Sequence, residues 1–154
     1  MVNFAVFKTD LGYIKIVERN GAVEEISFIN NPTDFGVANK TLNEAFKEIK
    51  EYLLGKRKEF TFKYGLKGTP FQVRVWKELE KIPYGETKTY KDIAEAVGCP
   101  KGCRAVGGAI HNNPIGIVVP CHRVIGKNGK LTGYAGGLEI KEELLKLESK
   151  KMLV

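Results

Sequence analysis

Residues 89–112 read TYKDIAEAVGCPKGCRAVGGAIHN, and this stretch predicts two short helices joined by a tight turn. Thr89 is of a residue type that caps helices through its side chain, and the first helix is expected to run through Val97. Residues 98–100, Gly-Cys-Pro, interrupt the pattern, and a second helix is expected from about 101 to 112. Two short helices with a glycine-containing turn are typical of a helix-turn-helix.

The second of these helices contains an adjacent pair of glycines, Gly107 and Gly108. Each glycine inside a helix costs about 1 kcal/mol relative to alanine, so something must compensate. Close packing against another element is one explanation, and close approach of a bare helix face, which includes Ala105, to a nucleic-acid backbone is the other. Arg104 begins this face. It is interpreted as a phosphate clamp or a probe that enters the base stack, with an ordinary solvated arginine as the alternative.

The N-terminal part of the chain predicts an antiparallel meander. Residues 3–8, 13–18 and 23–29 are short, β-rich and partly alternating, and Asn20-Gly21 between the last two is a strong signal for a tight hairpin. Apolar residues at helical spacing then predict a helix over residues 41–54.

The chain between that helix and the helix-turn-helix changes character at residue 69. Residues 59–63 are expected to form another short strand, and residues 65–70 read as a linker. Pro70 opens a helix that ends before residues 83–85, and Trp76 on its apolar face is expected in the core. Strands followed by helices indicate an α+β protein.

Residues 117–123 read IVVPCHR and set a cysteine beside a histidine at the exit of a predicted apolar strand. The structural interpretation of Cys121 is a small hydrophobic residue that packs in a core strand. The alternative is a nucleophile, which needs a nearby base such as His122 because only the thiolate is reactive. Consecutive residues of a strand point to opposite faces, so His122 can serve Cys121 only if the chain turns or a water bridges them. Arg123 favours the interpretation of this stretch as a functional site, because His122 and Arg123 are adjacent protonatable groups that are costly to bury unless they are paired or lie near a cleft.

Charge favours an anionic partner. The formal net charge is +7; residues 70–154 carry 14 Lys and Arg against 9 Asp and Glu, and residues 1–69 carry 11 against 9. The C-terminal part is therefore the expected surface for a partner such as nucleic acid.

The three cysteines argue against a disulfide framework. Cys99, Cys103 and Cys121 are an odd number, and the chain begins without a basic, apolar leader, so an intracellular protein is expected. No apolar run approaches the ~20 residues that span a bilayer, so no membrane partner is expected. Cys99 and Cys103 match no common zinc spacing and are expected to pack.

A glycine-rich loop and a final helix complete the chain. Residues 126–137 contain five glycines, which indicates a loop that bends sharply or approaches a ligand closely. Residues 141–152 predict an amphipathic helix whose exposed face carries charges, with Glu148 as a candidate exception.

In this order, the motifs at residues 104–107, 113–114, 120–124 and 133–138 resemble the O6-alkylguanine-DNA alkyltransferases, also called methylated-DNA–protein-cysteine methyltransferases. The resemblance covers the chain from residue 68 to 145 and, more loosely, the N-terminal meander and helix. It implies a ribonuclease-H-like N-terminal domain, residues 1–67, and a helical C-terminal domain, residues 68–154, that carries the helix-turn-helix.

The resemblance also implies an activity. Members bind duplex DNA through the minor groove, flip an alkylated guanine out of the stack, and move the alkyl group onto their own cysteine. Because the resulting thioether cannot be hydrolysed back, a single turnover per molecule is expected. The implied partner is a double-stranded DNA with O6-alkylguanine, or with O4-alkylthymine as a second lesion, bound by a monomer in the cytoplasm, or in the nucleus of a eukaryote.

Residue roles follow from the same resemblance. Cys121 is the acceptor, His122 the base acting through a water, and Glu148 the carboxylate that orients His122. Asn113 is a hinge that hydrogen-bonds around the active-site turn, Tyr90 assists rotation of the nucleotide, and Arg104 replaces the flipped base. The DNA-binding residues are Arg104, Ala105, Gly107 and Gly108, and the substrate-pocket residues are Val124, Tyr134, Ala135, Gly136 and Lys141.

Two features of the sequence limit this assignment. Some relatives have serine where this chain has Ala135, so a hydroxyl donor to guanine O6 is absent. A zinc site of some relatives depends on N-terminal Cys and His residues, which residues 1–69 lack, so no metal and no cofactor are expected.

The rivals are a non-catalytic sensor of the alkyltransferase-like type, a helix-turn-helix regulator with a structural thiol, and a cysteine hydrolase; the presence of Cys121 argues against the sensor.

Overall fold

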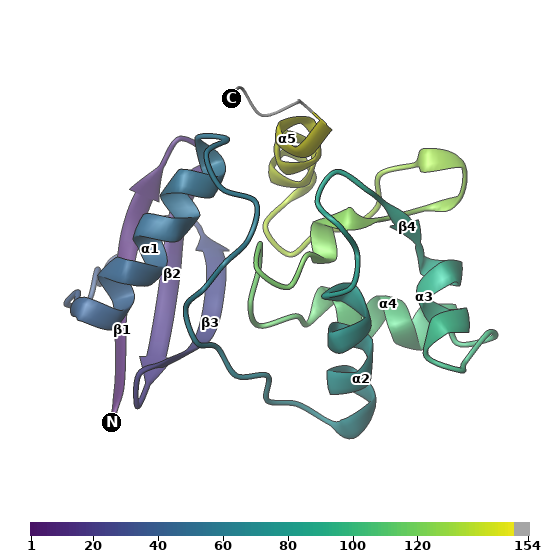
Figure 1. Ribbon diagram of the computed structural model, residues 1–154, viewed down its shortest axis with the longest axis horizontal. Coiled ribbons are helices and arrows are strands. Elements are labelled where there is room, and N and C mark those ends of the chain that lie inside the picture. Colours follow the sequence, from purple (N-terminus) through teal and green to yellow (C-terminus); the bar gives the residue numbers. More distant parts are fainter. Residues whose placement is uncertain (150–154) are drawn as a thin grey trace. The chain divides into compact units, whose positions relative to one another are not determined.

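The computed structural model describes residues 1–149, which form two compact units (Figure 1). Unit 1 comprises Met1–Leu66 together with Pro114–Gly116, and unit 2 comprises Lys67–Asn113 together with the described residues from Ile117 onward. Strands dominate unit 1 and helices dominate unit 2, so the predicted α+β class is confirmed.

Unit 1 is built on a three-stranded antiparallel sheet in the order β1-β2-β3, formed by Val2–Thr9, Gly12–Arg19 and Ala22–Ile29. Asn20 and Gly21 both have positive φ, at 53° and 82°, and they join β2 to β3 as the sequence predicts. Two successive left-handed residues match the twist of the strands, which is why Asn-Gly suits this position. The predicted meander is confirmed.

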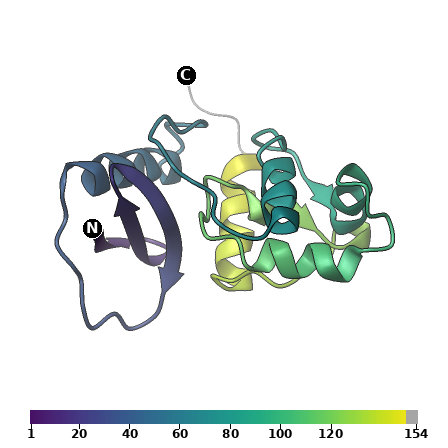
Figure 2. The same cartoon turned by 90° about the horizontal axis from the view of Figure 1, so that it is seen from below.

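Helix α1, Lys40–Leu53, packs on this sheet (Figures 1 and 2). The Asn39 side chain caps its first turn by accepting a hydrogen bond from Leu42 N. One core forms between β2 and α1. It buries alternate residues of the strand and one face of the helix, including Ile14, Ile16, Leu42 and Ile49, which are fully buried.

The strand predicted at residues 59–63 is wrong. Directly after this segment, Tyr64 forms an isolated bridge to Val23. The Glu48 side chain instead accepts hydrogen bonds from the backbone N and the hydroxyl of Thr61, at 2.7 and 2.6 Å. Because a side chain of α1 takes the backbone group that a ladder would use, β-rich residues here form an irregular strap.

Unit 2 begins with α2, Pro70–Leu79, capped by Thr69 and packed against α4, Cys103–His111. The indole nitrogen of Trp76, a residue 2% exposed, donates to Ala109 O at 2.8 Å. The core position predicted for Trp76 is confirmed, and its polar atom has the partner that burial requires.

The two helices predicted at the opening stretch are both present. Thr89 caps α3, Tyr90–Ala96, in a reciprocal capping box with Asp92. Helix α4 begins at Cys103, two residues later than expected, because Gly102 N bonds to Cys99 O in a tight turn before the helix starts. A two-residue strand, β4 at Lys88–Thr89, precedes α3 and pairs with β5, Val124–Ile125.

The apolar strand predicted to end at Pro120 is also wrong. Ile117 has a left-handed φ of 70°, and residues 117–119 form turns with Ile117 and Val119 buried. Burial of these side chains does not require a ladder, because the Val119 carbonyl accepts hydrogen bonds from the Asn113 side chain and from Cys121 N. An apolar run alone does not distinguish a strand from a buried turn.

The final helix, α5, runs over Leu138–Ser149 and so begins three residues before its predicted start. Its predicted end at residue 152 lies outside the described residues. Within residues 1–149, no helix is long and apolar enough to cross a bilayer.

Candidate active site

Cys121 opens a short 3-10 helix, Cys121–Arg123, that lies within unit 2. Pro120 precedes it with φ −80° and ψ 64°, and Arg123 N bonds to Pro120 O, so the chain turns here. The three residues of this turn are 7%, 0% and 7% exposed. The strand geometry that would have separated Cys121 from His122 is therefore absent.

A buried carboxylate joins this turn to α5. Glu148 is 4% exposed, and its Oε2 lies 2.7 Å from His122 Nε2. The contact predicted between these two residues is present in the structure. With Glu148 ionised, the hydrogen of a neutral His122 sits on Nε2, which leaves the lone pair on Nδ1.

The same carboxylate is held on its other side by Arg123. Arg123 donates from Nε to Glu148 Oε1 at 2.7 Å and from its Nη2 to Oε2 at 3.0 Å, while Nη1 donates to Ile82 O at 2.6 Å. A bidentate guanidinium is the strongest partner available to a buried carboxylate. The sequence indicated only that a buried Arg123 needed a partner, and it did not place Arg123 in the site.

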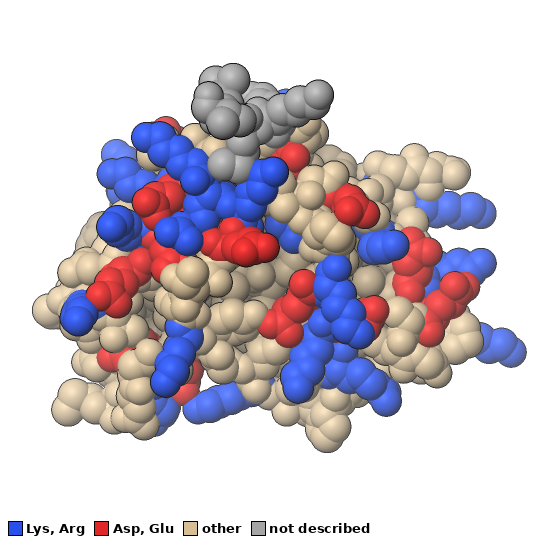
Figure 3. Space-filling model, in the orientation of Figure 1, with Lys and Arg blue, Asp and Glu red and all other residues tan. Residues whose placement is uncertain are grey.

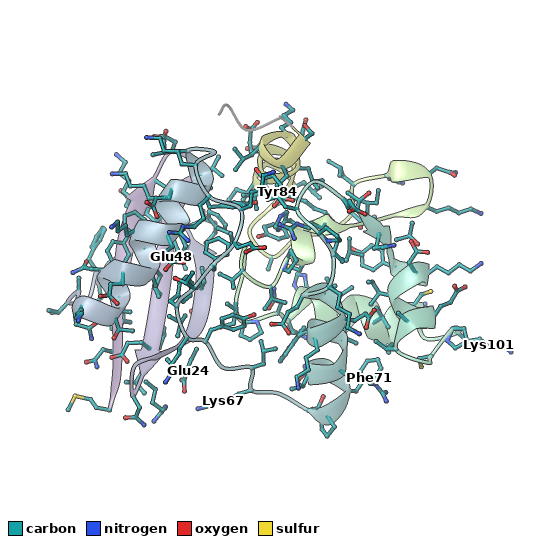
Figure 4. All side chains as sticks on the ribbon, in the orientation of Figure 1. Glu24, Glu48, Lys67, Phe71, Tyr84 and Lys101 are labelled. Atoms are coloured by element: carbon teal, nitrogen blue, oxygen red, sulfur yellow. The ribbon has the colours of Figure 1, made fainter. Side chains whose placement is uncertain are left out.

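Residues of the turn between α2 and β4 contact this ion pair. The guanidinium of Arg123 lies 5.7 Å from the centre of the Tyr84 ring, and the Tyr84 hydroxyl donates to Leu147 O of α5 at 3.4 Å (Figure 4). Gly85 N donates to Glu148 Oε1 at 3.4 Å. Burial and the nearby Glu148 charge raise the pKa of Tyr84, so its hydroxyl stays neutral. The sequence predicted only that a helix ends before residues 83–85, and it gave these residues no part in the site.

Burial sets the protonation of the histidine. Burial lowers the pKa of His122 from its ordinary 6.5, and the hydrogen bond and charge of Glu148 oppose this only in part. His122 is therefore a neutral base at pH 7, fixed in one orientation by the carboxylate.

Burial also keeps the cysteine protonated. It raises the pKa of Cys121 above its ordinary 9.0, against the effects of a hydrogen bond from Asn113 and the charge of Lys141. A thiol in this state is unreactive until a base removes its proton. The site thus holds a neutral thiol and a neutral imidazole on adjacent residues.

Residues of the loop before α5 surround the thiol. Burial first and the neighbouring Cys121 second raise the pKa of Tyr134 well above its ordinary value, and the two side chains are hydrogen-bonded. Lys141, 1% exposed, donates from Nζ to Thr132 O at 3.1 Å, and its pKa is lowered by burial. The Thr132 hydroxyl donates to the Tyr90 hydroxyl at 2.8 Å. Tyr90 is thereby linked to the same loop.

The remaining pocket residues differ in exposure. Val124 is fully buried directly after the turn, Gly136 is half-buried, and Ala135 is exposed. The structure thus groups Cys121, His122, Asn113 and Glu148 through direct contacts, and it brings Tyr134 and Lys141 to them from the loop and α5.

Helix α4 presents a bare face. Arg104, Ala105 and Gly108 are exposed, and a Cβ on Gly108 would meet no atom within 4 Å. A Cβ on Gly107 would lie 4.0 Å from the Tyr90 ring, an ordinary contact. Packing against described residues therefore does not require either glycine, which favours the close-approach explanation.

The other two cysteines are not part of this site. Cys99 is half-buried, and its sulfur occupies the space that a side chain on Gly102 would take. Cys103 is exposed, so the expectation that it packs is wrong: it occupies the outer face of the first turn of α4. Among residues 1–149, no group of three or more His, Cys, Asp or Glu side chains is placed to hold a metal ion.

Comparisons with known proteins point to one family. Residues 70–150 match the family model described as 6-O-methylguanine DNA methyltransferase, DNA binding domain. The chain is 45% identical over 151 residues to a methylated-DNA–protein-cysteine methyltransferase of Methanosarcina acetivorans, with 94% of this chain and 97% of the relative covered.

Solved structures agree. The crystal structure of Mycobacterium tuberculosis O6-methylguanine methyltransferase superposes with a TM-score of 0.88 at 38% identity, covering 97% of this chain and 93% of that chain. The crystal structure of Mycobacterium tuberculosis OGT in complex with DNA gives 0.87 at 39% identity, covering 95% and 92%.

The ion pair between Arg123 and Glu148 makes a stability prediction. Arg123→Met should lower the free energy of unfolding in urea by about 3–5 kcal/mol, because it leaves a buried carboxylate without its cation. Arg19→Met is the matched control, because the Arg19–Glu24 pair lies on the surface of unit 1, where a pair contributes about 0–1 kcal/mol. Equal losses in the two variants would contradict the assignment.

Proposed function

The chain belongs to the methylated-DNA–protein-cysteine methyltransferases, and we propose that Cys121 is the residue that accepts the alkyl group. The protein is a DNA-repair enzyme that removes an alkyl group from DNA by transferring it to itself. The observation that carries the residue assignment is the arrangement of a protonated thiol, a neutral imidazole and a buried carboxylate on one turn and one helix.

Transfer from O6 of guanine needs no group beyond these. Nδ1 of His122 takes the thiol proton through a water molecule, and Sγ attacks the alkyl carbon in line with the O6 bond. The carbon–oxygen bond breaks, and the guanine that leaves with the electron pair takes up a proton from imidazolium. The products are a thioether on Cys121 and an unmodified guanine, with no net proton gained or lost.

Glu148 acts through His122 in this scheme. Its charge stabilises the imidazolium that exists after proton transfer, and its hydrogen bond keeps Nδ1 as the accepting atom. No carbonyl is present in the thioether for water to attack, so each molecule reacts once.

The other site residues position the base. Asn113 bonds both to the Val119 carbonyl and to Cys121, which fixes the turn around the nucleophile. We assign guanine contacts to the carbonyls of Cys121 and Val124, the hydroxyls of Tyr90 and Tyr134, and the backbone of Ala135 and Gly136. The charge of Lys141 acts on Cys121 and favours the thiolate.

Helices α3 and α4 form the proposed helix-turn-helix, with α4 against the minor groove of duplex DNA. The exposed face of Arg104, Ala105 and Gly108 lets a backbone approach closely, and a flipped guanine leaves a gap that the Arg104 guanidinium fills. Base flipping costs a few kcal/mol, which the pocket and this insertion offset. One copy suffices, and O4-alkylthymine is a second substrate of the same chemistry.

The direct test is intact mass after incubation with a duplex that contains one O6-methylguanine. Wild type should gain the mass of one methylene group, once per molecule, and peptide mapping should place it on Cys121. Cys121→Ser should gain nothing, and the control Cys103→Ser should react like wild type because that thiol is exposed, whereas Cys121 is buried directly beside His122. Repeated turnover, or a modified residue other than Cys121, would overturn the proposal.

Arg104→Ala separates DNA engagement from chemistry. The transfer rate in duplex DNA should fall about tenfold or more. If the flipped state loses about 1.4 kcal/mol of stabilisation, its population falls by a factor of ten. The rate with free O6-methylguanine base should not change, because Arg104 does not touch the thiol. Arg74→Ala, an exposed arginine on α2, is the control and should leave both rates unchanged. An equal loss of transfer rate on both substrates in Arg104→Ala would contradict the insertion of Arg104 into the base stack.

A further inference from the structure

The positive charge of unit 1 is confined to one part of it. Residues 40–66 carry seven Lys and Arg against four Asp and Glu, whereas residues 1–39 carry three against five. The excess lies after α1: residues 54–66 carry four Lys and Arg against one Glu, whereas α1 itself carries three against three and so do the strands of the sheet. Figure 3 shows Lys and Arg side chains gathered over the C-terminal end of α1 and the following segment.

The end of α1 is built rigidly. Gly55, at φ 75°, donates from N to Tyr52 O, and Lys56 N donates to Glu51 O, which together form a Schellman motif. Arg57 then folds back and donates from Nε and Nη2 to Glu51 Oε1, at 3.1 and 3.0 Å. The chain that carries Lys56 is thus fixed against the helix.

Two acidic side chains of α1, those of Glu48 and Glu51, have partners within unit 1. Glu51 is engaged by Arg57. Glu48, whose place beside the strap is labelled in Figure 4, accepts both hydrogen bonds from Thr61 and lies 3.4 Å from Arg57. Arg57 offsets one of these two carboxylate charges, and the exposed lysines at the end of α1 and just after it leave the surface there with a net positive charge.

Lys47, Lys50 and Lys56 are exposed on this surface, here called the α1 lysine cluster. Lys47 and Lys50 are three residues apart and share one helix face. Lys50 in the last turn complements the helix dipole, but that effect does not explain the other two, which lie outside the last turn.

We propose that the α1 lysine cluster contacts the phosphate backbone of DNA and gives unit 1 its own sequence-independent share of binding. Lysine is suited to this role because it acts as a mobile point charge toward phosphate. The inference rests on DNA as the partner of the protein, and it adds a DNA-binding surface outside unit 2 and its Cys121 site.

The test is the salt dependence of binding to an undamaged duplex, measured by fluorescence anisotropy. In the triple variant K47Q/K50Q/K56Q, the slope of log K against log salt concentration should become shallower by about 0.9 for each phosphate that is no longer neutralised, or about 2–3 in all. The control K8Q/K15Q/R19Q removes the same charge from β1 and β2 and should keep the wild-type slope.

Two outcomes would overturn the proposal: an unchanged slope in the cluster variant, or an equal change in the control. If the unchanged slope came with weaker binding to phosphatidylserine vesicles, the cluster would be assigned to a membrane surface. Transfer from free O6-methylguanine to the cluster variant should match wild type. Failure of that transfer in wild type itself would refute the proposed function, and the slopes on undamaged DNA would still decide the lysine proposal.

Discussion

A single carboxylate, that of Glu148, accepts hydrogen bonds from both His122 and Arg123 inside unit 2. Leaving a carboxylate buried costs several kcal/mol unless a charged partner compensates, and the bidentate guanidinium supplies that partner. The ionised carboxylate then fixes the histidine tautomer, and the histidine so oriented is the base that can take the proton of the neighbouring thiol. The ion pair therefore determines both the stability of the turn and its chemistry.

Burial of the thiol is suited to a residue that is used once. Because burial raises the pKa of Cys121, the thiol stays protonated in the free protein and resists attack by incidental electrophiles. A neutral His122 beside it can activate the sulfur when a substrate is in place. Reactivity is thereby tied to occupation of the pocket, and the irreversible step is reserved for the lesion.

Local signals in the sequence predicted most elements, and long-range contacts explain the failures. Asn20-Gly21, Pro70 and the Thr89 cap each act within a few residues, so the hairpin, α2 and α3 follow from them. The wrong strand at residues 59–63 depends on Glu48, 13 residues away from Thr61. Arg123 and Glu148 are 25 residues apart, and only the fold shows that they pair. Family resemblance supplied Glu148 but not Arg123 or Tyr84.

The pH dependence of transfer from free O6-methylguanine tests the central claim most directly. With His122 as a neutral base whose pKa lies below 6.5 and a thiol whose pKa lies above 9.0, the rate should be constant between these values and should fall only as His122 is protonated below pH 6.5. Glu148→Gln should lower the rate on this plateau. A rate that rises about tenfold per pH unit from 6.5 to 9, in wild type and Glu148→Gln alike, would show a preformed thiolate acting without His122 and would contradict the account.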